Sequence, residues 1–148
     1  MKKFIVIFLA LACLCVNTYA QLNVTYLNEK GSEKIITLQL AYSYIEKSST
    51  GYMIWIKTNN RFDKISNIYL GEDVESALQT LNDMKNLIVN EIASVSVSQP
   101  GGDIVLFYRN ELGVKQLWTK QDGYAGYSWI TLAQLEKAIK KFESLINN

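Results

Sequence analysis

Histidine is absent from the 148-residue sequence, which also has a single proline and only two cysteines. Both cysteines, Cys13 and Cys15, lie within the first twenty residues. Without imidazole there can be no Ser-His-Asp triad and no histidine general base. Beyond residue 20 there is also no thiol for nucleophilic catalysis, for a disulfide or for a zinc site. We therefore expect no metal and no cofactor.

The first twenty residues have the layout of a secretory signal peptide. Two lysines precede an apolar run over residues 4–16, and Thr18 and Ala20 supply the small residues that a signal peptidase reads. The run is shorter than the roughly 20 residues that a membrane-spanning helix needs, and no later segment is longer or more apolar. We expect cleavage after Ala20, which would export residues 21–148 without a transmembrane segment.

The cysteines of this leader allow a second interpretation, in which one of them carries a lipid anchor. The context fits poorly, because Leu14 is too large for the position that precedes Cys15, and a cut before Cys13 would leave a very short apolar core. The sequence therefore favours a periplasmic or secreted protein over a lipid-anchored one. The leader followed by Gln21 resembles that of many small exported bacterial proteins, a resemblance confined to residues 1–21.

Neither sign of charge dominates. The whole chain has 15 basic and 14 acidic side chains, and loss of the two lysines of the leader leaves 13 basic and 14 acidic. Nucleic-acid-binding domains usually carry a clear basic excess that contacts phosphates. We therefore expect no nucleic acid partner.

Strand patterns fill the first part of the mature chain. Residues 33–47 alternate between apolar and polar, which predicts one long, half-buried strand. Turn residues at 48–51 separate it from 52–57, a segment that is apolar on both faces and fits the middle of a sheet. A more polar strand is predicted over 62–70, and a short one over 22–26.

A helix and then a second set of strands follow. Asp73 is placed to cap a helix whose apolar residues recur every three or four positions up to residue 92. Further strands are predicted over 94–98, 104–109, 114–120 and 124–130. A second amphipathic helix begins after Thr131, which with Gln134 forms a capping box.

These patterns predict an α+β fold with one antiparallel sheet of six to eight strands and two amphipathic helices on one of its faces. The order is β-meander, helix, β-meander, helix. We expect residues 21–148 to form one domain with halves at 21–92 and 93–148. Internal duplication would explain why the two helices match position for position and why 52–57 resembles 104–109. The alternative is that amphipathic helices match one another through their shared period.

Aromatic side chains with a polar group are the clearest compositional feature, with 9 Tyr and 3 Trp in the chain against 5 Phe. Such rings suit surfaces that bind sugars or proteins, although rings in strands more often fill a core. The loop 122–127, with two glycines and two tyrosines, resembles either a binding rim or a hairpin turn with a bulge at Gly126. The candidate binding residues are Trp55, Tyr108, Trp118, Tyr124 and Tyr127.

The sequence therefore predicts a small exported, non-catalytic domain that binds a protein or a glycan. The alternative is a small hydrolase that acts on glycans with carboxylates. Its candidate acids all fall in predicted turns, and no pair of them can be placed across a cleft; they are Asp63, Asp103, Glu111 and Asp122. A third interpretation is a structural subunit assembled through the edge strand at 22–26. The sequence leaves the partner and the oligomeric state open.

Overall fold

The computed structural model describes residues 31–39, 43–59, 65–123 and 126–147. Contacts divide the chain into two compact units, residues 1–31 and 32–148, and the helices and strands described lie in the second unit. The predicted strand over 22–26 and the candidate residue Tyr124 lie outside the described residues.

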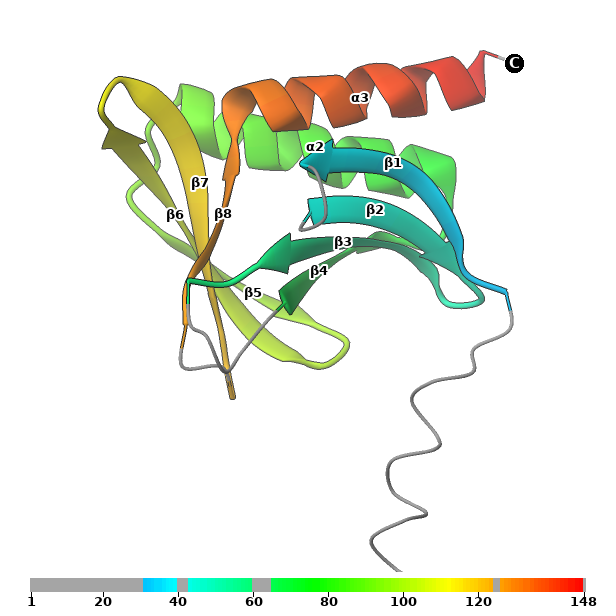
Figure 1. The fold of residues 1–148 in the computed structure, drawn as a ribbon, viewed down its shortest axis with the longest axis horizontal. Coiled ribbons are helices and arrows are strands. Elements are labelled where there is room, and N and C mark those ends of the chain that lie inside the picture. The colour runs from blue at the N-terminus through cyan, green and yellow to red at the C-terminus, as the bar shows by residue number, and fades with distance from the viewer. Residues whose placement is uncertain (1–30, 40–42, 60–64, 124–125, 148) are drawn as a thin grey trace, which may run out of the picture. The chain divides into compact units, whose positions relative to one another are not determined.

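Two four-stranded meanders, each followed by a helix, make up the unit (Figure 1). The first comprises β1 (Glu33–Gln39), β2 (Ser43–Ser48), β3 (Gly51–Lys57), β4 (Ile65–Gly71) and α2 (Val74–Val89). The second comprises β5 (Val95–Gln99), β6 (Gly102–Glu111), β7 (Val114–Gln121), β8 (Ser128–Thr131) and α3 (Leu132–Ile146). The α+β class and the order of meanders and helices are as the sequence predicted.

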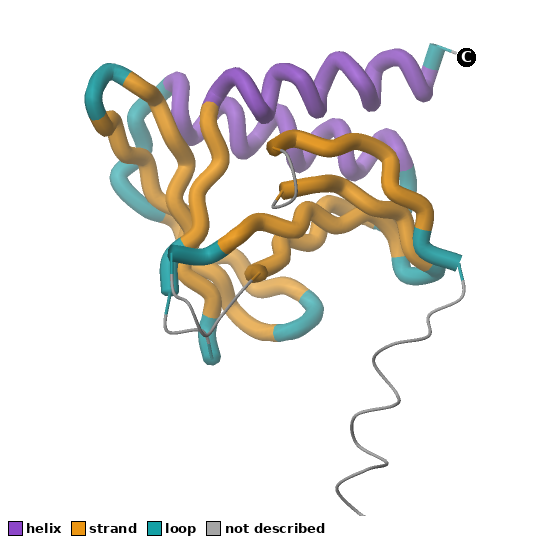
Figure 2. Tube along the Cα trace, viewed as in Figure 1, coloured by secondary structure: helices purple, strands orange, loops and turns teal. Residues whose placement is uncertain are grey.

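The prediction of a single shared sheet is wrong. Strands β1 to β4 form one antiparallel sheet, here called sheet A, and strands β5 to β8 form another, sheet B. Figure 2 shows the two groups of strands below a pair of helices. The match between 52–57 and 104–109 also joins non-equivalent strands, because β3 is the third strand of its meander and β6 the second of its own.

The single strand predicted over 33–47 is also wrong, because this segment contains two antiparallel strands. Gln39 of β1 pairs with Ser43 of β2, so the chain reverses between them. The reversal changes which residues face the core: Leu38, Ser43 and Ile45 are buried, whereas Tyr44 points to the opposite face. Unbroken alternation over residues 33–47 would instead put Tyr44 on the same side as Leu38.

Both helix starts are confirmed. The Asp73 carboxylate accepts a hydrogen bond from Ser76 N at 2.7 Å, and the Ser76 hydroxyl accepts one from Asp73 N in return. The Ser76 side chain first, and its backbone N–H second, hold the pKa of the Asp73 carboxyl below its usual range. At α3, Thr131 and Gln134 form the same reciprocal box.

One hydrophobic core joins both sheets to both helices. Helix α2 contacts β4 of sheet A and also β6 and β7 of sheet B, while α3 contacts β1 of sheet A and also β7 and β8. The helices lie side by side along one side of the sheets (Figure 1). Their fully buried residues are Ala77, Leu81, Met84 and Ile88 on α2 and Leu135, Ala138 and Phe142 on α3.

Glutamine side chains, rather than a neighbouring strand, cover the outer edge of β4. The side-chain amide of Gln99 of β5 accepts a hydrogen bond from Tyr69 N at 2.9 Å and donates one to the Asn67 carbonyl at 3.1 Å. These are the bonds that the backbone of a neighbouring strand would otherwise form. Gln121 of β7, itself buried, accepts from Asn67 N at 3.3 Å. These bonds satisfy edge groups of sheet A with residues of sheet B, so they join the two sheets without making them one.

This arrangement predicts that Gln99→Ala lowers the free energy of unfolding by about 1–2 kcal/mol, because two backbone groups lose their partner. The amide hydrogen of Tyr69 should then exchange with solvent faster, as measured by NMR. Ser96→Ala, at an exposed position of the same strand, is the matched control and should leave both quantities unchanged. Unaltered exchange at Tyr69 in Gln99→Ala would refute the proposed role of the glutamine.

Candidate functional site

Alternation along the strands of sheet B separates a core face from an outer face. Ile104, Leu106, Leu117, Thr119, Ser128 and Ile130 are buried on the core face. The residues between them therefore point away from the helices. Any binding surface on this sheet must use these outward positions.

Four aromatic residues come together on this outer face. Phe107 of β6 pairs directly with Trp118 of β7, which pairs with Trp129 of β8. The Trp118 ring centroid lies 6.3 Å from that of Phe107 and 5.3 Å from that of Trp129. The Tyr127 ring packs edge-on against Phe107 at 6.0 Å. We call these four residues the aromatic row.

Two cations lie over the aromatic row. The Arg109 guanidinium is 4.6 Å from the centre of the Trp118 ring, and Lys120 Nζ is 5.8 Å from that of Tyr127. Both side chains belong to exposed residues. Arg109 also forms an ion pair with Glu111 at 3.6 Å, which anchors it at the margin of the row. The outer face of sheet B thus combines stacked rings with an arginine, residue types that are enriched at binding surfaces.

Trp118 and Trp129 differ in how they are held. Trp118 lies between the other rings and donates its indole N–H to Gln116 at 2.7 Å. Trp129 stacks on Trp118 with 23° between the ring planes and keeps 38% of its surface exposed. Trp129 is thus the most accessible tryptophan of the row, supported by a ring that is itself fixed.

A cleft of about 400 Å³ opens beside Trp129, where the end of β3 meets β8. Thr58 forms an isolated bridge with Ser128, and Asn59 exchanges two hydrogen bonds of 2.8 Å with the backbone of Tyr127. The described residues that line the cleft are Gln39, Ser43, Ile56, Lys57, Thr58, Asn59 and Trp129. The aromatic row therefore ends at an opening between the two sheets.

The structure brings two of the five predicted binding residues together, since Trp118 and Tyr127 both belong to the aromatic row. Trp55 lies on the outer face of sheet A, where it stacks on Tyr44 at 6.4 Å and donates to Glu46 at 2.7 Å. Burial, followed by the nearby Glu46 carboxylate, raises the pKa of the Tyr44 hydroxyl. Trp55 is thus packed against its own sheet and is separate from the aromatic row.

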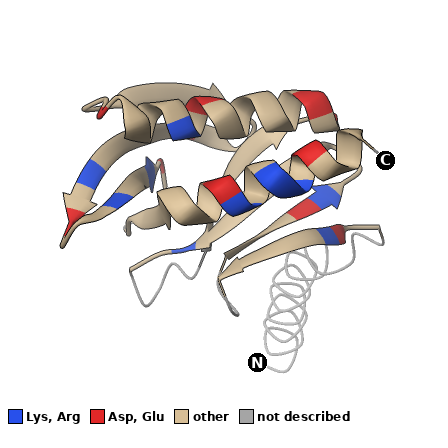
Figure 3. Cartoon of the chain, turned by 90° about the horizontal axis from the view of Figure 1, so that it is seen from above, with Lys and Arg blue, Asp and Glu red and all other residues tan. Residues whose placement is uncertain are grey.

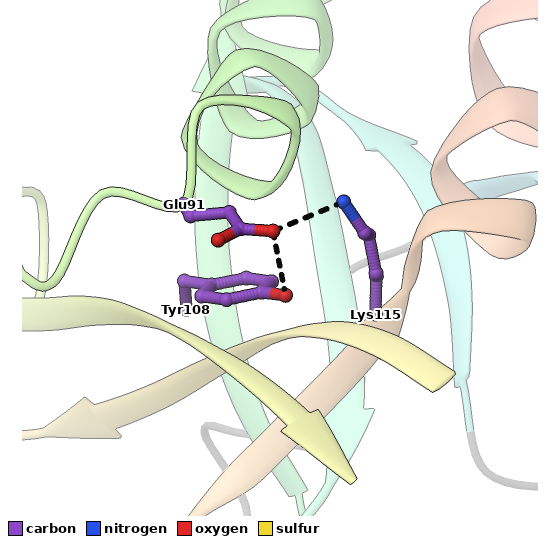
Figure 4. Close-up of polar contacts among 3 residues, drawn as sticks. All are labelled: Glu91, Tyr108 and Lys115. Atoms are coloured by element: carbon purple, nitrogen blue, oxygen red, sulfur yellow. Dashed lines mark hydrogen bonds and ion pairs between the residues drawn. The ribbon is translucent and has the colours of Figure 1, made fainter. Parts of the chain in front are cut away.

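Tyr108 lies on the core face of sheet B, opposite the aromatic row, and packs against the hydrophobic core. Its hydroxyl donates to Glu91 Oε1 at 3.3 Å, and Lys115 Nζ donates to the same oxygen at 3.2 Å (Figure 4). Glu91 follows the end of α2 in a left-handed conformation, with φ 53°. Tyr108 and Lys115 therefore tie the end of the helix to sheet B, which is a structural task.

Phe107 and Trp129 belong to the row but were not among the predicted residues. The turn at Leu112–Gly113 would have identified Phe107, because Glu111 pairs with Val114 and counting outward by alternate residues puts Phe107 opposite Trp118. Trp129 could not be identified in the same way. Its pairing with Trp118 depends on the length of the β7–β8 connection, which the sequence pattern does not define.

The candidate acids form no enclosed pair in the part of the chain that the structure describes. Asp103 and Asp122 lie next to each other, since Asp122 N donates to Asp103 O at 3.0 Å, but both are exposed at the ends of β6 and β7. Glu111 is exposed as well, and Asp63 lies outside the described residues. Nor do the described residues contain a group of three acidic residues able to hold a metal ion. Along the helices, acidic and basic residues are interspersed (Figure 3).

Comparison with known proteins gives no assignment: no family model, no curated protein and no solved structure matches the chain. Among the described residues, no helix has the length and apolar character required to cross a membrane.

The packing of the row predicts unequal effects of two tryptophan substitutions. Trp118→Ala should lower the free energy of unfolding by about 2–3 kcal/mol, because it removes the ring that contacts all three others. Trp129→Ala should cost about 1 kcal/mol, since its ring is partly in solvent already. Urea unfolding of both variants measures the difference. Equal losses would show that Trp129 is as much a packing residue as Trp118.

Proposed function

We propose that this chain is a small exported, non-catalytic binding domain whose protein or glycan ligand contacts the aromatic row of sheet B. The observation that carries the proposal is the exposed end of that row. Trp129 rests on Trp118, remains 38% exposed and lies at the opening of a cleft. Export is proposed from the leader at residues 1–20.

A purely structural role explains this surface less well than a binding role does. Cross-strand aromatic pairs do stabilise sheets, and the contacts of Phe107 and Trp118 fit that role. If the row served only to stabilise the sheet, a large ring left partly in water at its end would add little to the free energy of folding, because only buried apolar area contributes to hydrophobic stabilisation. Arg109 and Lys120 add exposed positive charge beside the rings, and aromatic and arginine side chains are the ones that most often dominate binding energy.

The hydrolase alternative lacks a supporting observation in the described residues. Cleavage of a glycosidic bond needs two carboxyl groups on opposite sides of the bond, separated by about 5–10 Å across a cleft. The described lining of the cleft beside Trp129 contains neither Asp nor Glu. Binding without catalysis is therefore the function that this geometry supports best.

The test uses the mature chain, residues 21–148, immobilised and exposed to a cell-envelope extract of the source organism. We expect it to retain one protein or polysaccharide, and expect Arg109→Ala/Trp129→Ala to retain about tenfold less of it. The matched control is Lys34→Ala/Trp55→Ala, which removes a cation and a tryptophan from the outer face of sheet A and should retain the normal amount. Equal retention by the two double variants, or none by the parent chain, would contradict the proposal.

A further inference from the structure

The cleft beside Trp129 has a composition that points to one class of ligand. Five of its seven described lining residues carry hydroxyl, amide or ammonium groups, and only Ile56 and Trp129 are apolar. Sites for apolar side chains or drug-like molecules show the opposite balance, with mostly hydrophobic walls and few polar groups. The ligand should therefore offer many hydrogen-bonding groups together with one flat apolar face.

Trp129 supplies the matching flat surface. One face of its indole stacks on Trp118, and 38% of the surface of Trp129 remains exposed even though the end of β3 bridges to β8 at Ser128. The ring also lines the cleft. Stacking on a fixed neighbour restricts the ring in advance, which lowers the entropy lost when a ligand binds.

Indole N–H groups distinguish Trp129 from the other two tryptophans. Trp55 donates to Glu46 and Trp118 donates to Gln116, each at 2.7 Å. Trp129 makes no such bond to any residue that the structure describes. Its N–H is therefore available as a donor beside the exposed face of the ring.

The floor and the rim of the cleft differ in accessibility. Ser43, Ile56 and Thr58 are buried and form its floor, whereas Gln39, Lys57 and Asn59 are exposed at its rim. The Asn59 side-chain oxygen accepts a hydrogen bond from Tyr127 N at 2.8 Å, which fixes the position of the amide. Polar groups held at a rim around one aromatic wall can bind hydroxyl groups arranged around a ring.

From these features we propose that the cleft is a saccharide subsite, in which the apolar C–H face of one pyranose ring stacks on Trp129. Its hydroxyl groups hydrogen-bond to polar side chains of the rim. A pyranose has an apolar face and hydroxyl groups around its edge, as the cleft requires. The inference rests on the proposed function and deepens it, since it selects a glycan over a protein as the ligand.

The experiment titrates the mature chain with six soluble oligosaccharides: cellohexaose, chitohexaose, xylohexaose, mannohexaose, laminarihexaose and maltohexaose. Isothermal titration calorimetry gives the affinity, and tryptophan fluorescence reports a change at the ring. We expect at least one of the six to bind and to shift the emission. Binding by none of them overturns the saccharide proposal.

Four variants locate the subsite. Trp129→Ala should weaken binding about tenfold or more, and Trp129→Phe should restore most of it because a smaller ring still stacks. Gln39→Ala, at the exposed rim, should weaken binding about threefold or more. Trp55→Ala, which removes a tryptophan from the other sheet, should bind as the parent chain does. Equal losses in Trp55→Ala and Trp129→Ala, or unchanged binding in Trp129→Ala, would overturn the assignment.

Failure of this inference is distinguishable from failure of the proposed function. Suppose that the mature chain captures a protein from the envelope extract, that this capture depends on Arg109 and Trp129, and that none of the six oligosaccharides binds. The saccharide subsite is then wrong, while the proposal of a binding domain is supported. If capture does not depend on Arg109 and Trp129, the proposed function itself is wrong.

Discussion

The structure depends on one constraint: each helix buries its apolar stripe against both sheets at once. Helix α2 follows sheet A in the chain yet also packs on β6 and β7, and α3 follows sheet B yet also packs on β1. Neither meander with its own helix therefore completes the core alone. Because the inner faces of both sheets are committed to this core, the outer faces and the junction between the sheets are what remain for a ligand.

The outer faces of the two sheets differ in how their aromatic residues are arranged. On sheet A the rings and their polar groups bind one another, as Trp55 stacks on Tyr44 and donates to Glu46. On sheet B the aromatic row runs across three strands and ends with Trp129 exposed at the cleft. The glutamines that join the sheets lie elsewhere, at the edge of β4, and neither Gln99 nor Gln121 is among the described residues that line the cleft.

The features that the sequence predicted correctly depend on contacts between residues that are close together in the chain. Both helix starts depend on contacts three residues apart, at Asp73 with Ser76 and at Thr131 with Gln134, so they are visible in the sequence. The reversal between Gln39 and Ser43 was missed because residues 40–42, Leu-Ala-Tyr, contain no Gly, Pro, Asn or Asp and continue the apolar alternation. The division into two sheets was missed because whether β4 and β5 pair depends on contacts between residues far apart in the chain, which leave no periodic signal. For the same reason the sequence did not show that Trp118 and Tyr127 lie together while Tyr108 and Trp55 lie on other faces.

The central claim is that Trp129 is fixed by Trp118 yet open to solvent at the junction of the sheets. Its most direct test is the exchange rate of the three indole N–H hydrogens with water, measured by NMR and assigned with the Trp55→Phe and Trp129→Phe variants. The account predicts that Trp129 exchanges much faster than Trp55 and Trp118, whose N–H groups are bonded to Glu46 and Gln116. A Trp129 signal protected as strongly as the other two would contradict it.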